Sequence, residues 1–318
     1  MKPLYLLALA IFLFSSCSLL PVEEVPQSQV CPSMPADLPL SADGQPILRV
    51  YITGSDQLQE MGMERYLEGV VAGEMKNTWP LEALKAQAIL ARTFALRFLS
   101  EKESRYPGAD ISTDVTEAQA YNADAVNERV RQAVQKTAGL VLAEADGTLP
   151  YTWFHAHSGG MTDLARNALG WTHPEPAYTR ITDGLDSDDA PANVRFWTAS
   201  FTEQDFLDAC HRAGVKVNTL DTLRIHRTSP SGRAVTLMVN ATEVDAARLR
   251  IELGSTLMRS TLLTDLRLAD GQVLMAGRGY GHGVGMPQWG AYALAQDGWR
   301  GEDIALHYYQ GLQVVKLW

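Results

Sequence analysis

The chain has 318 residues, of which 46% are hydrophobic and 20% are charged, close to the composition of ordinary globular proteins. This composition excludes disordered and collagen-like chains, and the length provides a sizeable core for one large or two ordinary domains. The net charge of −10 argues against a protein that coats nucleic acid, because neutralising phosphates requires a basic face.

The first residues are typical of an export signal. Lys2 precedes an apolar run at residues 4–14, which is shorter than the roughly 20 residues that a membrane-spanning helix needs. Two serines then lead to Cys17, an ending that resembles a bacterial lipobox. We therefore predict that residues 1–17 are a lipoprotein-type signal and that Cys17 is the lipidation site, which anchors an extracytoplasmic protein in the cell envelope. An ordinary cleaved signal and an uncleaved anchor are the alternatives.

Residues 18–45 are predicted to form an extended tether, since they contain five prolines and little periodicity. Cys31 lies in this tether and Cys210 lies far downstream. In an oxidising compartment the two cysteines could form a disulfide, but their separation in sequence says nothing about their distance in space.

Residues 46–318 predict a single α+β domain in which helices pack on antiparallel strands, because no repeat and no change of composition divides this part of the chain. Apolar residues at helical spacing predict helices over residues 63–75, 80–99, 125–138 and 203–213. Runs rich in β-branched and other apolar residues predict strands over residues 47–53, 140–143, 151–155, 222–226, 235–239 and 262–268.

Glu74 is the most unusual residue of the first predicted helix. At about 100° per residue it points into the apolar stripe that includes Leu67, Val71 and Met75. A carboxyl there is either paired or shifted toward its neutral form by desolvation, and a neutral carboxyl near pH 7 is what a general acid requires. The alternative is a structural glutamate bonded to a backbone amide or to an arginine such as Arg92.

A glycine-rich segment covers residues 277–288, GRGYGHGVGMPQ. Its five glycines alternate with other residues, so an extended chain would present one face of bare backbone to a ligand or to another chain. Arg278, Tyr280 and His282 would lie on the opposite face. The spacing matches neither a dinucleotide-binding nor a phosphate-binding loop. Tight packing of a strand is the alternative.

A third feature is the segment at residues 155–163, HAHSGGMTD. His155 and His157 would share one face of a strand and could bind zinc, but the sequence shows no third ligand. We favour a Ser-Gly-Gly turn at Ser158 that presents hydroxyl and amide donors to a polar ligand. Pairing of Ser158 with His282 for nucleophilic catalysis is a further alternative, although the chain lacks a G-x-S-x-G elbow.

Three stretches of the chain together resemble the SpoIID/LytB family, which comprises stage II sporulation protein D and its amidase-enhancer relatives. They are residues 66–96 (YLEGVVAGEMKNTWPLEALKAQAILARTFAL), 154–163 (FHAHSGGMTD) and 277–295 (GRGYGHGVGMPQWGAYALA). Residues 114–121 (DVTEAQAY) are similar to the family's D-x-x-x-x-Q-x-Y stretch. The resemblance covers about residues 46–318 and implies one domain with a glycan-binding cleft.

The resemblance also implies a lytic transglycosylase that acts on peptidoglycan glycan strands without a cofactor. The family's catalytic glutamate falls on Glu74, and Lys85 and Arg92 match positions associated with its cleft. The other substrate-binding candidates are Tyr121, Ser158, Gly159, Gly160, Thr162, Tyr280, His282 and Gln288. Some relatives hold zinc through cysteines near the Ser-Gly-Gly turn; those cysteines are absent here, so no metal is expected.

A single acid would be enough for this reaction. Glu74 would protonate the oxygen that joins N-acetylmuramic acid to N-acetylglucosamine, and its carboxylate would then take the proton of the muramic C6 hydroxyl, which closes on C1. No water attacks, so the second carboxylate of ordinary glycosidases is not needed. The alternative functions are a non-catalytic amidase enhancer, with a cell-wall amidase as partner, and an envelope scaffold whose groove binds another protein.

Overall fold

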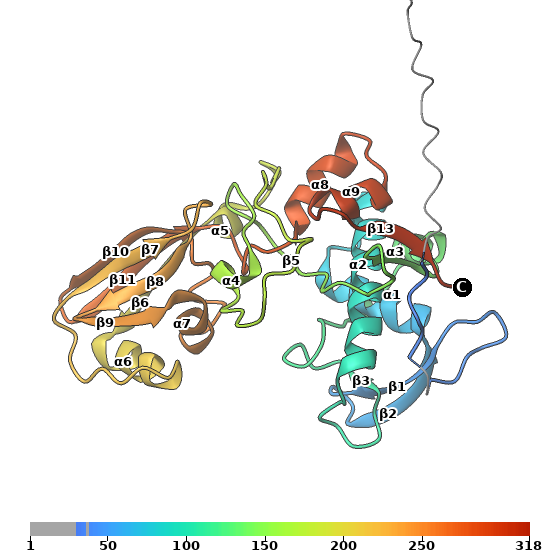
Figure 1. The fold of residues 1–318 in the computed structure, drawn as a ribbon, viewed down its shortest axis with the longest axis horizontal. Coiled ribbons are helices and arrows are strands. Elements are labelled where there is room, and N and C mark those ends of the chain that lie inside the picture. Colours follow the sequence, from blue (N-terminus) through green and yellow to red (C-terminus); the bar gives the residue numbers. More distant parts are fainter. Residues whose placement is uncertain (1–29, 36–37) are drawn as a thin grey trace, which may run out of the picture.

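The computed structural model describes residues 30–35 and 38–318 as a mixture of helices and mainly antiparallel strands, which confirms the predicted α+β class. The described chain forms two lobes connected by a junction (Figure 1). The predicted signal, its lipidation site Cys17 and the first part of the tether lie outside the described residues. Among the described residues, no helix is both long and apolar enough to cross a membrane.

The first lobe is built around α2 (Leu81–Glu101), which is buried along most of its length. Small side chains allow neighbouring helices to approach it closely, and those without exposed surface are Ala83, Ala86, Ala88, Ala91 and Ala95. The helices that pack on α2 are α1 (Met63–Glu74), α3 (Glu128–Lys136), α8 (Gln288–Gln296) and α9 (Gly301–His307).

Two small sheets complete the first lobe. In one, β1 (Ile47–Ile52) pairs antiparallel with β2 (Gln57–Gly62) and parallel with β3 (Ile111–Ser112). In the other, β4 (Leu140–Ala143) pairs antiparallel with β13 (Gln313–Lys316). The last strand of the chain is thereby attached to its middle.

The second lobe contains two three-stranded antiparallel sheets and two helices. One sheet has the order β10-β11-β6, and the other has the order β7-β8-β9. The strands are β6 (Phe196–Thr202), β7 (Leu223–Thr228), β8 (Ala234–Val239), β9 (Thr242–Asp245), β10 (Leu263–Ala269) and β11 (Gln272–Arg278). The helices are α6 (Glu203–Arg212) and α7 (Ala246–Glu252).

The junction contains only short elements. They are β5 (Phe154–His155), α4 (Ala165–Ala168), α5 (Ala192–Arg195) and β12 (Met286–Pro287), and β5 pairs parallel with β12. Each lobe has its own main cluster of buried hydrophobic side chains. The second lobe is one continuous stretch inserted between two parts of the first. Because it has the same kind of composition, the sequence showed no boundary.

Most predicted elements are confirmed, with differences at their ends. The helix expected over residues 125–138 begins at Glu128, because the Asn127 side chain caps it by accepting a hydrogen bond from Val130 N–H. A 3₁₀ turn, η1 (Ala123–Ala125), precedes it. The strand expected over residues 151–155 is reduced to β5, and the Tyr151 N–H donates to the Tyr178 hydroxyl instead of to a neighbouring strand.

The bare extended face expected for the glycine-rich segment is wrong. Four of its glycines have φ between +68° and +117°, namely Gly279, Gly281, Gly283 and Gly285. Glycine adopts this left-handed region without the steric cost that other residues meet. A Cβ on Gly279 would overlap the backbone of residues 157–159, and one on Gly283 would overlap the Arg233 guanidinium. These glycines allow close packing in the junction, which was the alternative interpretation.

The disulfide considered from the sequence is not formed. Cys31 is exposed, Cys210 is buried in the core of the second lobe, and both thiols are free. Burial raises the pKa of the Cys210 thiol to about 11, so this cysteine remains an unreactive thiol at neutral pH.

Candidate active site

Glu74 is the last residue of α1, and two neutral donors hold its carboxyl group. The Ala120 N–H donates to Oε1 over 2.8 Å, and the Gln288 side-chain amide donates to Oε2 over 3.4 Å. The helix ends here because Met75 turns to extended backbone, with φ −126° and ψ 156°. Arg92, the alternative partner considered from the sequence, binds Glu64 instead.

The surroundings of Glu74 favour its neutral form. Desolvation raises the pKa of Glu74 above the usual value of a glutamic acid, and the hydrogen bonds from Ala120 and Gln288 lower it by a smaller amount. The carboxyl therefore keeps its proton to a higher pH than it would in water, as a general acid requires. Glu74 accepts a backbone N–H, as the structural interpretation expected, and its pKa is raised; its role as a general acid stays a prediction.

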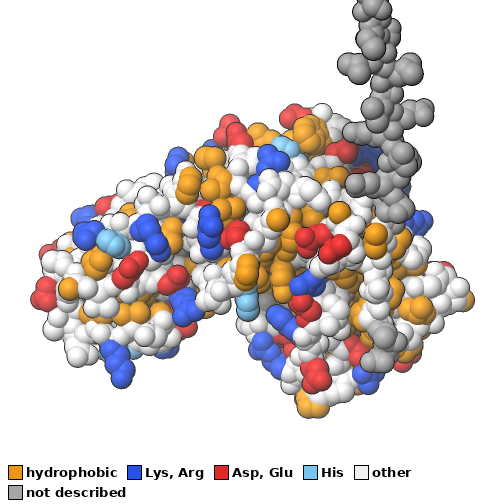
Figure 2. Space-filling model, in the orientation of Figure 1, with side chains coloured by type: hydrophobic (Ala, Val, Ile, Leu, Met, Phe, Trp, Pro, Cys, Tyr) orange, Lys and Arg blue, Asp and Glu red, His pale blue; other side chains and the backbone are white. Residues whose placement is uncertain are grey.

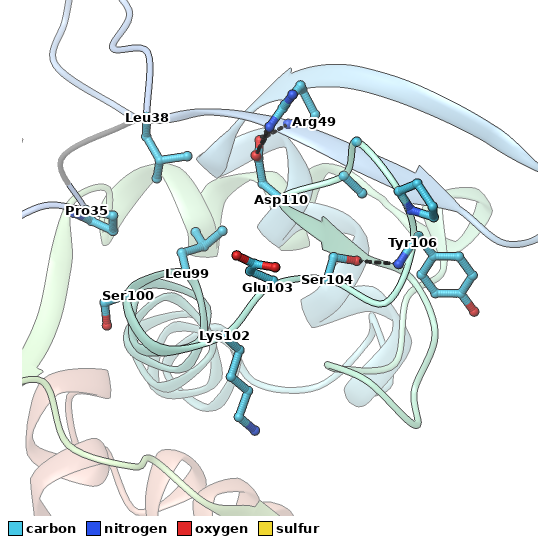
Figure 3. A pocket seen from close by; sticks show the side chains of 13 residues that line it. Pro35, Leu38, Arg49, Leu99, Ser100, Lys102, Glu103, Ser104, Tyr106 and Asp110 are labelled. Carbon is cyan, nitrogen blue, oxygen red and sulfur yellow. Dashed lines mark hydrogen bonds and ion pairs between the residues drawn. The ribbon is translucent and has the colours of Figure 1, made fainter.

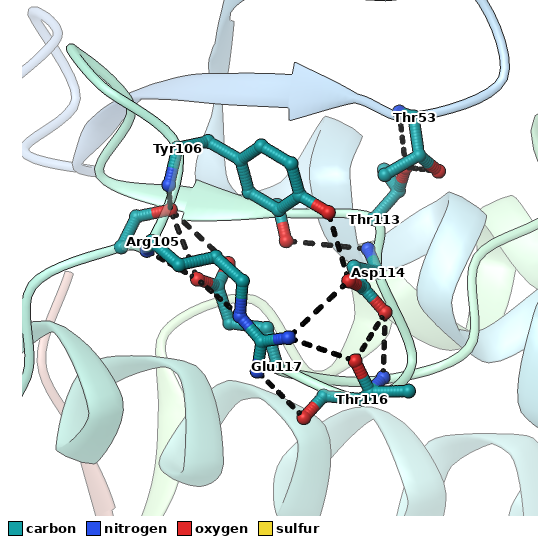
Figure 4. A network of polar contacts seen from close by, with 9 residues as sticks. Thr53, Arg105, Tyr106, Thr113, Asp114, Thr116 and Glu117 are labelled. Carbon is teal, nitrogen blue, oxygen red and sulfur yellow. Dashed lines mark hydrogen bonds and ion pairs between the residues drawn. The ribbon is translucent and has the colours of Figure 1, made fainter.

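The Ala120 N–H reaches the carboxyl because ionic contacts hold the loop before it, as Figure 4 shows. The Arg105 guanidinium lies 3.6 Å from Oδ2 of Asp114 and 3.7 Å from Oε1 of Glu117. The Tyr106 hydroxyl donates to Asp114 over 2.8 Å. This loop is the DVTEAQAY stretch, and its acidic residues Asp114 and Glu117 stabilise the loop but do not line the cavity.

A cavity of about 520 Å³ opens beside Glu74 where the two lobes meet, and the visible surface of the molecule is notched between them (Figure 2). The first lobe contributes Glu74, and the second lobe contributes Arg250 from α7. The other residues that line the cavity are Phe94, Val115, Ala118, Gln119, Thr152, Trp153, Phe154, His155, Ala156, Tyr280, Gly281, His282 and Gln288. Three predicted residues, Tyr280, His282 and Gln288, are thus brought together with Glu74.

A second hollow, of about 490 Å³, also has Glu74 in its lining. It is more open than the cavity, and its lining consists of Ala72, Gly73, Glu74, Met75, Lys76, Asn77, Thr78 and Ala125. Glu74 belongs to the lining of both spaces.

Two histidines form part of the cavity wall, with ring centres 5.4 Å apart. Desolvation and the guanidiniums of Arg250 and Arg233 lower the pKa of His282 to about 3. Desolvation also lowers the pKa of His155 far below its usual value. Both rings are neutral near pH 7, so they can exchange hydrogen bonds with a ligand but supply no charge.

The expected common face of His155 and His157 is not observed. His155 faces the cavity, whereas His157 Nδ1 lies 3.3 Å from Asp186 in a separate hollow of about 280 Å³. The chain leaves β5 immediately after His155, so strand alternation does not continue to His157. Within residues 30–35 and 38–318, no group of three or more His, Cys, Asp or Glu side chains is arranged to hold a metal ion.

The Ser-Gly-Gly turn lies away from the Glu74 cavity. Ser158 is fully buried, and its hydroxyl donates to Asp186 rather than to His282, so no nucleophilic pair forms. Thr162 is also fully buried, and its hydroxyl donates to the Arg180 carbonyl over 3.0 Å. Gly159 and Gly160 line the hollow beside His157. These four predicted binding residues support the junction and do not line the cavity.

The two predicted cations of α2 make internal ion pairs. Arg92 is fully buried, lies against both carboxylate oxygens of Glu64 and donates to the Leu140 carbonyl over 2.9 Å. Lys85 lies 2.8 Å from Glu82 and 3.4 Å from Glu302 on α9. Neither cation lines the cavity or contacts Glu74. They attach α2 to the start of α1 and to α9.

Of the two aromatic residues predicted to bind substrate, Tyr280 lines the Glu74 cavity and Tyr121 lies outside it. Tyr121 packs over Gly69 and stacks on Tyr66, with ring centres 5.9 Å apart. Trp79 and Trp289 are buried against each other in the first lobe, with ring centres 4.6 Å apart. Within the described residues of the cavity, the aromatic surface comes instead from Phe94, Trp153, Phe154 and Tyr280.

A further hollow, of about 610 Å³, shares no residue with the Glu74 cavity (Figure 3). It lies between the end of α2, the loop before β3 and the segment that contains Pro35 and Leu38. Its charged groups include Arg49 and Asp110, which neutralise each other in an ion pair at 2.6 Å. This hollow does not contain Glu74 and is not our candidate site.

The cavity contains residues that the sequence analysis did not select. Gln119 lies within the DVTEAQAY stretch, one residue before Ala120, and that motif could have identified it. Phe94 lies within the motif at residues 66–96, which could also have identified it, whereas nothing around Arg250 in the sequence distinguishes it from its neighbours on α7. Only the packing of the second lobe against the junction places Arg250 in the cavity wall.

Comparisons with known proteins agree with this arrangement. A family model, SpoIID, described as "Stage II sporulation protein", matches residues 51–143. An uncharacterized protein of Brachyspira hyodysenteriae is 31% identical over 259 residues, which cover 81% of this chain and 68% of that protein. Stage II sporulation protein D of Bacillus subtilis is 29% identical over 279 residues, covering 83% and 78%. The amidase enhancer of Bacillus subtilis is 27% identical over 293 residues, covering 77% and 39%.

Proposed function

The chain belongs to the SpoIID family, and from this premise we propose that it is a lytic transglycosylase of peptidoglycan glycan strands with Glu74 as its only acid and base. Relatives named for sporulation and for amidase enhancement support a cell-wall-related role. The observation that carries the finer proposal is the setting of Glu74. It is a carboxyl with a raised pKa and neutral hydrogen-bond partners, placed where two hollows meet.

The first step uses the neutral carboxyl. Glu74 donates its proton to the oxygen between C1 of N-acetylmuramic acid and C4 of N-acetylglucosamine, and the bond from C1 to this oxygen breaks. N-acetylglucosamine leaves with a C4 hydroxyl. The Ala120 N–H and the Gln288 amide then stabilise the carboxylate that forms, because each already donates to one of its oxygens.

The second step uses that carboxylate as a base. It takes the proton of the C6 hydroxyl of N-acetylmuramic acid, and O6 forms a bond to C1, which gives a 1,6-anhydro sugar and restores neutral Glu74. Ordinary glycosidases place a second carboxylate at the reacting carbon. Among the described residues that line the cavity, Glu74 is the only Asp or Glu, which supports closure by the sugar's own hydroxyl.

Replacing Glu74 by Gln tests the proposal. The Gln side chain keeps the shape but cannot donate and recover a proton, and general acid–base catalysis contributes about 10²–10⁴-fold to a rate. We expect the formation of 1,6-anhydro products from purified peptidoglycan, measured by mass spectrometry, to fall toward the upper end of that range. The matched control is Glu68→Gln on the same helix, since Glu68 pairs with Arg65 and lies outside both hollows.

A Glu74→Gln chain that kept more than about a tenth of the wild-type rate would contradict the assignment. Glu74 would then be a structural residue that fixes the Ala120 loop. In that outcome the chain would be a glycan-binding protein without cleavage, as in the enhancer alternative. Retained binding of glycan strands by the same variant would separate loss of chemistry from loss of fold.

A further inference from the structure

Arg250 is the only Lys or Arg among the described residues that line the Glu74 cavity. It projects from α7 of the second lobe, so its position depends on how the lobes pack. Its guanidinium donates through Nε to the Arg259 carbonyl over 3.1 Å and through Nη2 to the Ser255 carbonyl over 3.4 Å. These two bonds fix the guanidinium and leave Nη1 without a protein acceptor in the described chain.

No carboxylate of the described residues forms an ion pair with Arg250, although the residue is half-buried. Burial lowers the pKa of Arg250 to about 10, so it remains charged at neutral pH. Tyr280 and the neutral His282 line the same cavity as Arg250, and the positive charge of Arg250 contributes to the lowered pKa of His282. A partly desolvated cation that lines a cavity and has no counterion is less stable than a paired one, and an anionic ligand would complete this site.

The chemistry of the proposed substrate identifies the anion. N-acetylglucosamine carries no charge, whereas muramic acid carries a lactyl carboxylate or, when a stem peptide is attached, the carboxylates of that peptide. The planar guanidinium is suited to bind a carboxylate through two parallel hydrogen bonds. We propose that Arg250 binds a carboxylate carried by muramic acid and thereby sets the direction of the glycan strand. This inference rests on the proposed function.

The direction follows from the two hollows that meet at Glu74. With its carboxylate on Arg250, muramic acid lies in the cavity between the lobes, and the departing N-acetylglucosamine lies in the hollow at residues 72–78. The opposite direction would place the carboxylate near Lys76, which lines that second hollow. Lys76 is exposed, and its ammonium lies 5.7 Å from the centre of the Trp289 ring, so it is already solvated and partly satisfied.

Binding measurements on the full chain carrying Glu74→Gln test this inference without cleavage. The probes are glycan strands freed of stem peptides, the same strands with their carboxyls amidated, and strands with intact stem peptides. A hydrogen-bonded charge pair corresponds to about a 10- to 100-fold change in affinity. We expect peptide-free strands to bind more tightly than amidated strands by that factor, and Arg250→Gln to remove the difference.

Two variants serve as controls. Arg248→Gln, on an exposed part of α7, and Lys76→Gln are both expected to keep the preference for free carboxyls. Unchanged binding of amidated strands by Arg250→Gln shows that the variant is folded. If Arg250→Gln loses all binding, Arg250→Lys is measured instead, because lysine keeps the positive charge but lacks the two parallel N–H donors of the guanidinium. A weaker preference of Arg250→Lys for free over amidated carboxyls then supports the inference. If Arg250→Gln weakens the binding only of strands with intact stem peptides, the carboxylate that Arg250 binds belongs to the stem peptide.

The inference is overturned if Arg250→Gln or Arg250→Lys leaves the full preference in place, or if Lys76→Gln removes it. Failure of the proposed function has a different signature. In that case the wild-type chain makes no 1,6-anhydro product from any of the three probes, while the binding difference caused by Arg250 is still measurable.

Discussion

Two glutamates at opposite ends of α1 have contrasting surroundings. Glu64 meets the buried guanidinium of Arg92 and also accepts hydrogen bonds from the Gly139 N–H and the Trp318 indole, each at 3.1 Å. Glu74 has only neutral donors. Charge pairing makes the first a structural anion, and desolvation without a cation makes the second a carboxyl that can hold a proton. The same residue type on one helix thus has two roles.

The raised pKa of Glu74 predicts a pH dependence of both rate and stability. The acid must start protonated, so kcat/KM should fall as pH rises through the folded-state pKa of Glu74. Because this pKa is raised on folding, the contribution of Glu74 to the free energy of unfolding is complete below the usual value of 4.5 and is lost as pH rises through the folded-state pKa.

Thermal midpoints of wild type and Glu74→Gln, compared from about pH 4 to about pH 8, check the stability part. Wild type should lose stability relative to the Gln variant as pH rises, since Gln has no proton to release. If the difference between the two thermal midpoints stayed constant over this range, the pKa of Glu74 would not be raised by folding.

The Arg92–Glu64 pair predicts a structural role for a cation that the sequence associated with the cleft. Removing one partner of a buried ion pair typically costs about 3–5 kcal/mol, and Arg92→Met should lower the free energy of unfolding by that amount in urea titrations. Arg65→Met is the control, because the Arg65–Glu68 pair has a mostly exposed arginine and should be worth less than about 1 kcal/mol. Full stability of Arg92→Met with lost glycan binding would restore the cleft assignment.

At the scale of elements, the glycine-rich segment connects β11 to β12 and α8 through the most crowded part of the junction. Its left-handed glycines lie against the segment at residues 155–159 and against Arg233, which is fully buried and donates to the Ser158 carbonyl. The segment thereby carries Tyr280, His282 and Gln288 to the Glu74 cavity. Most of the glycines act on the site through packing, whereas Gly281 lines the cavity together with its neighbours Tyr280 and His282.

Gly283→Ala separates this packing role from an open ligand face. A Cβ at Gly283 would overlap the Arg233 guanidinium, whereas one at Gly298, which has a similar φ of +84°, meets nothing within 4 Å. Gly298→Ala should cost only the left-handed strain of about 1–2 kcal/mol. Gly283→Ala should cost a further 1–3 kcal/mol or so for overpacking, measured by urea unfolding. Equal costs at the two positions would show that Arg233 moves aside freely.

At the scale of the whole molecule, the second lobe completes a site that begins in the first. Glu74 belongs to α1 of the first lobe, Arg250 belongs to α7 of the second, and the cavity between them is walled by the junction. The first lobe thus provides the acid of the site, and the second lobe provides its fixed cation. The basic side chains visible in Figure 2 are interspersed with acidic ones and form no continuous basic stripe.

Anchoring through Cys17 remains a prediction about the whole chain, with residues 1–17 as signal, 18–45 as tether and 46–318 as the folded part. We propose that the protein works in the cell envelope, where peptidoglycan, its proposed substrate, is found. Cys17→Ala should abolish metabolic labelling with a fatty acid and leave an unprocessed or soluble protein in cell fractions. Cys31→Ala is the matched control and should keep the label. Labelling that survives Cys17→Ala would exclude the lipobox interpretation.

The sequence by itself determined the family, the mixed α+β class and the position of Glu74 near the end of the first predicted helix. These depend on local information, since 3–4 spacing of apolar residues specifies a helix and a motif identifies a family. The sequence also identified Tyr280, His282 and Gln288, because they lie within a motif whose residues remain close together after folding.

Only the tertiary structure decided which charges are paired and which face the cavity. The sequence suggested Arg92 and Lys85 as cations of the cleft, but the fold pairs Arg92 with Glu64 and Lys85 with Glu82 and Glu302. Arg250 has no distinguishing sequence pattern, and only the packing of the second lobe on the junction places it in the cavity wall. The physical reason is that the energy of a charge depends on its burial and on partners distant in the chain, whereas a helical period depends only on neighbours.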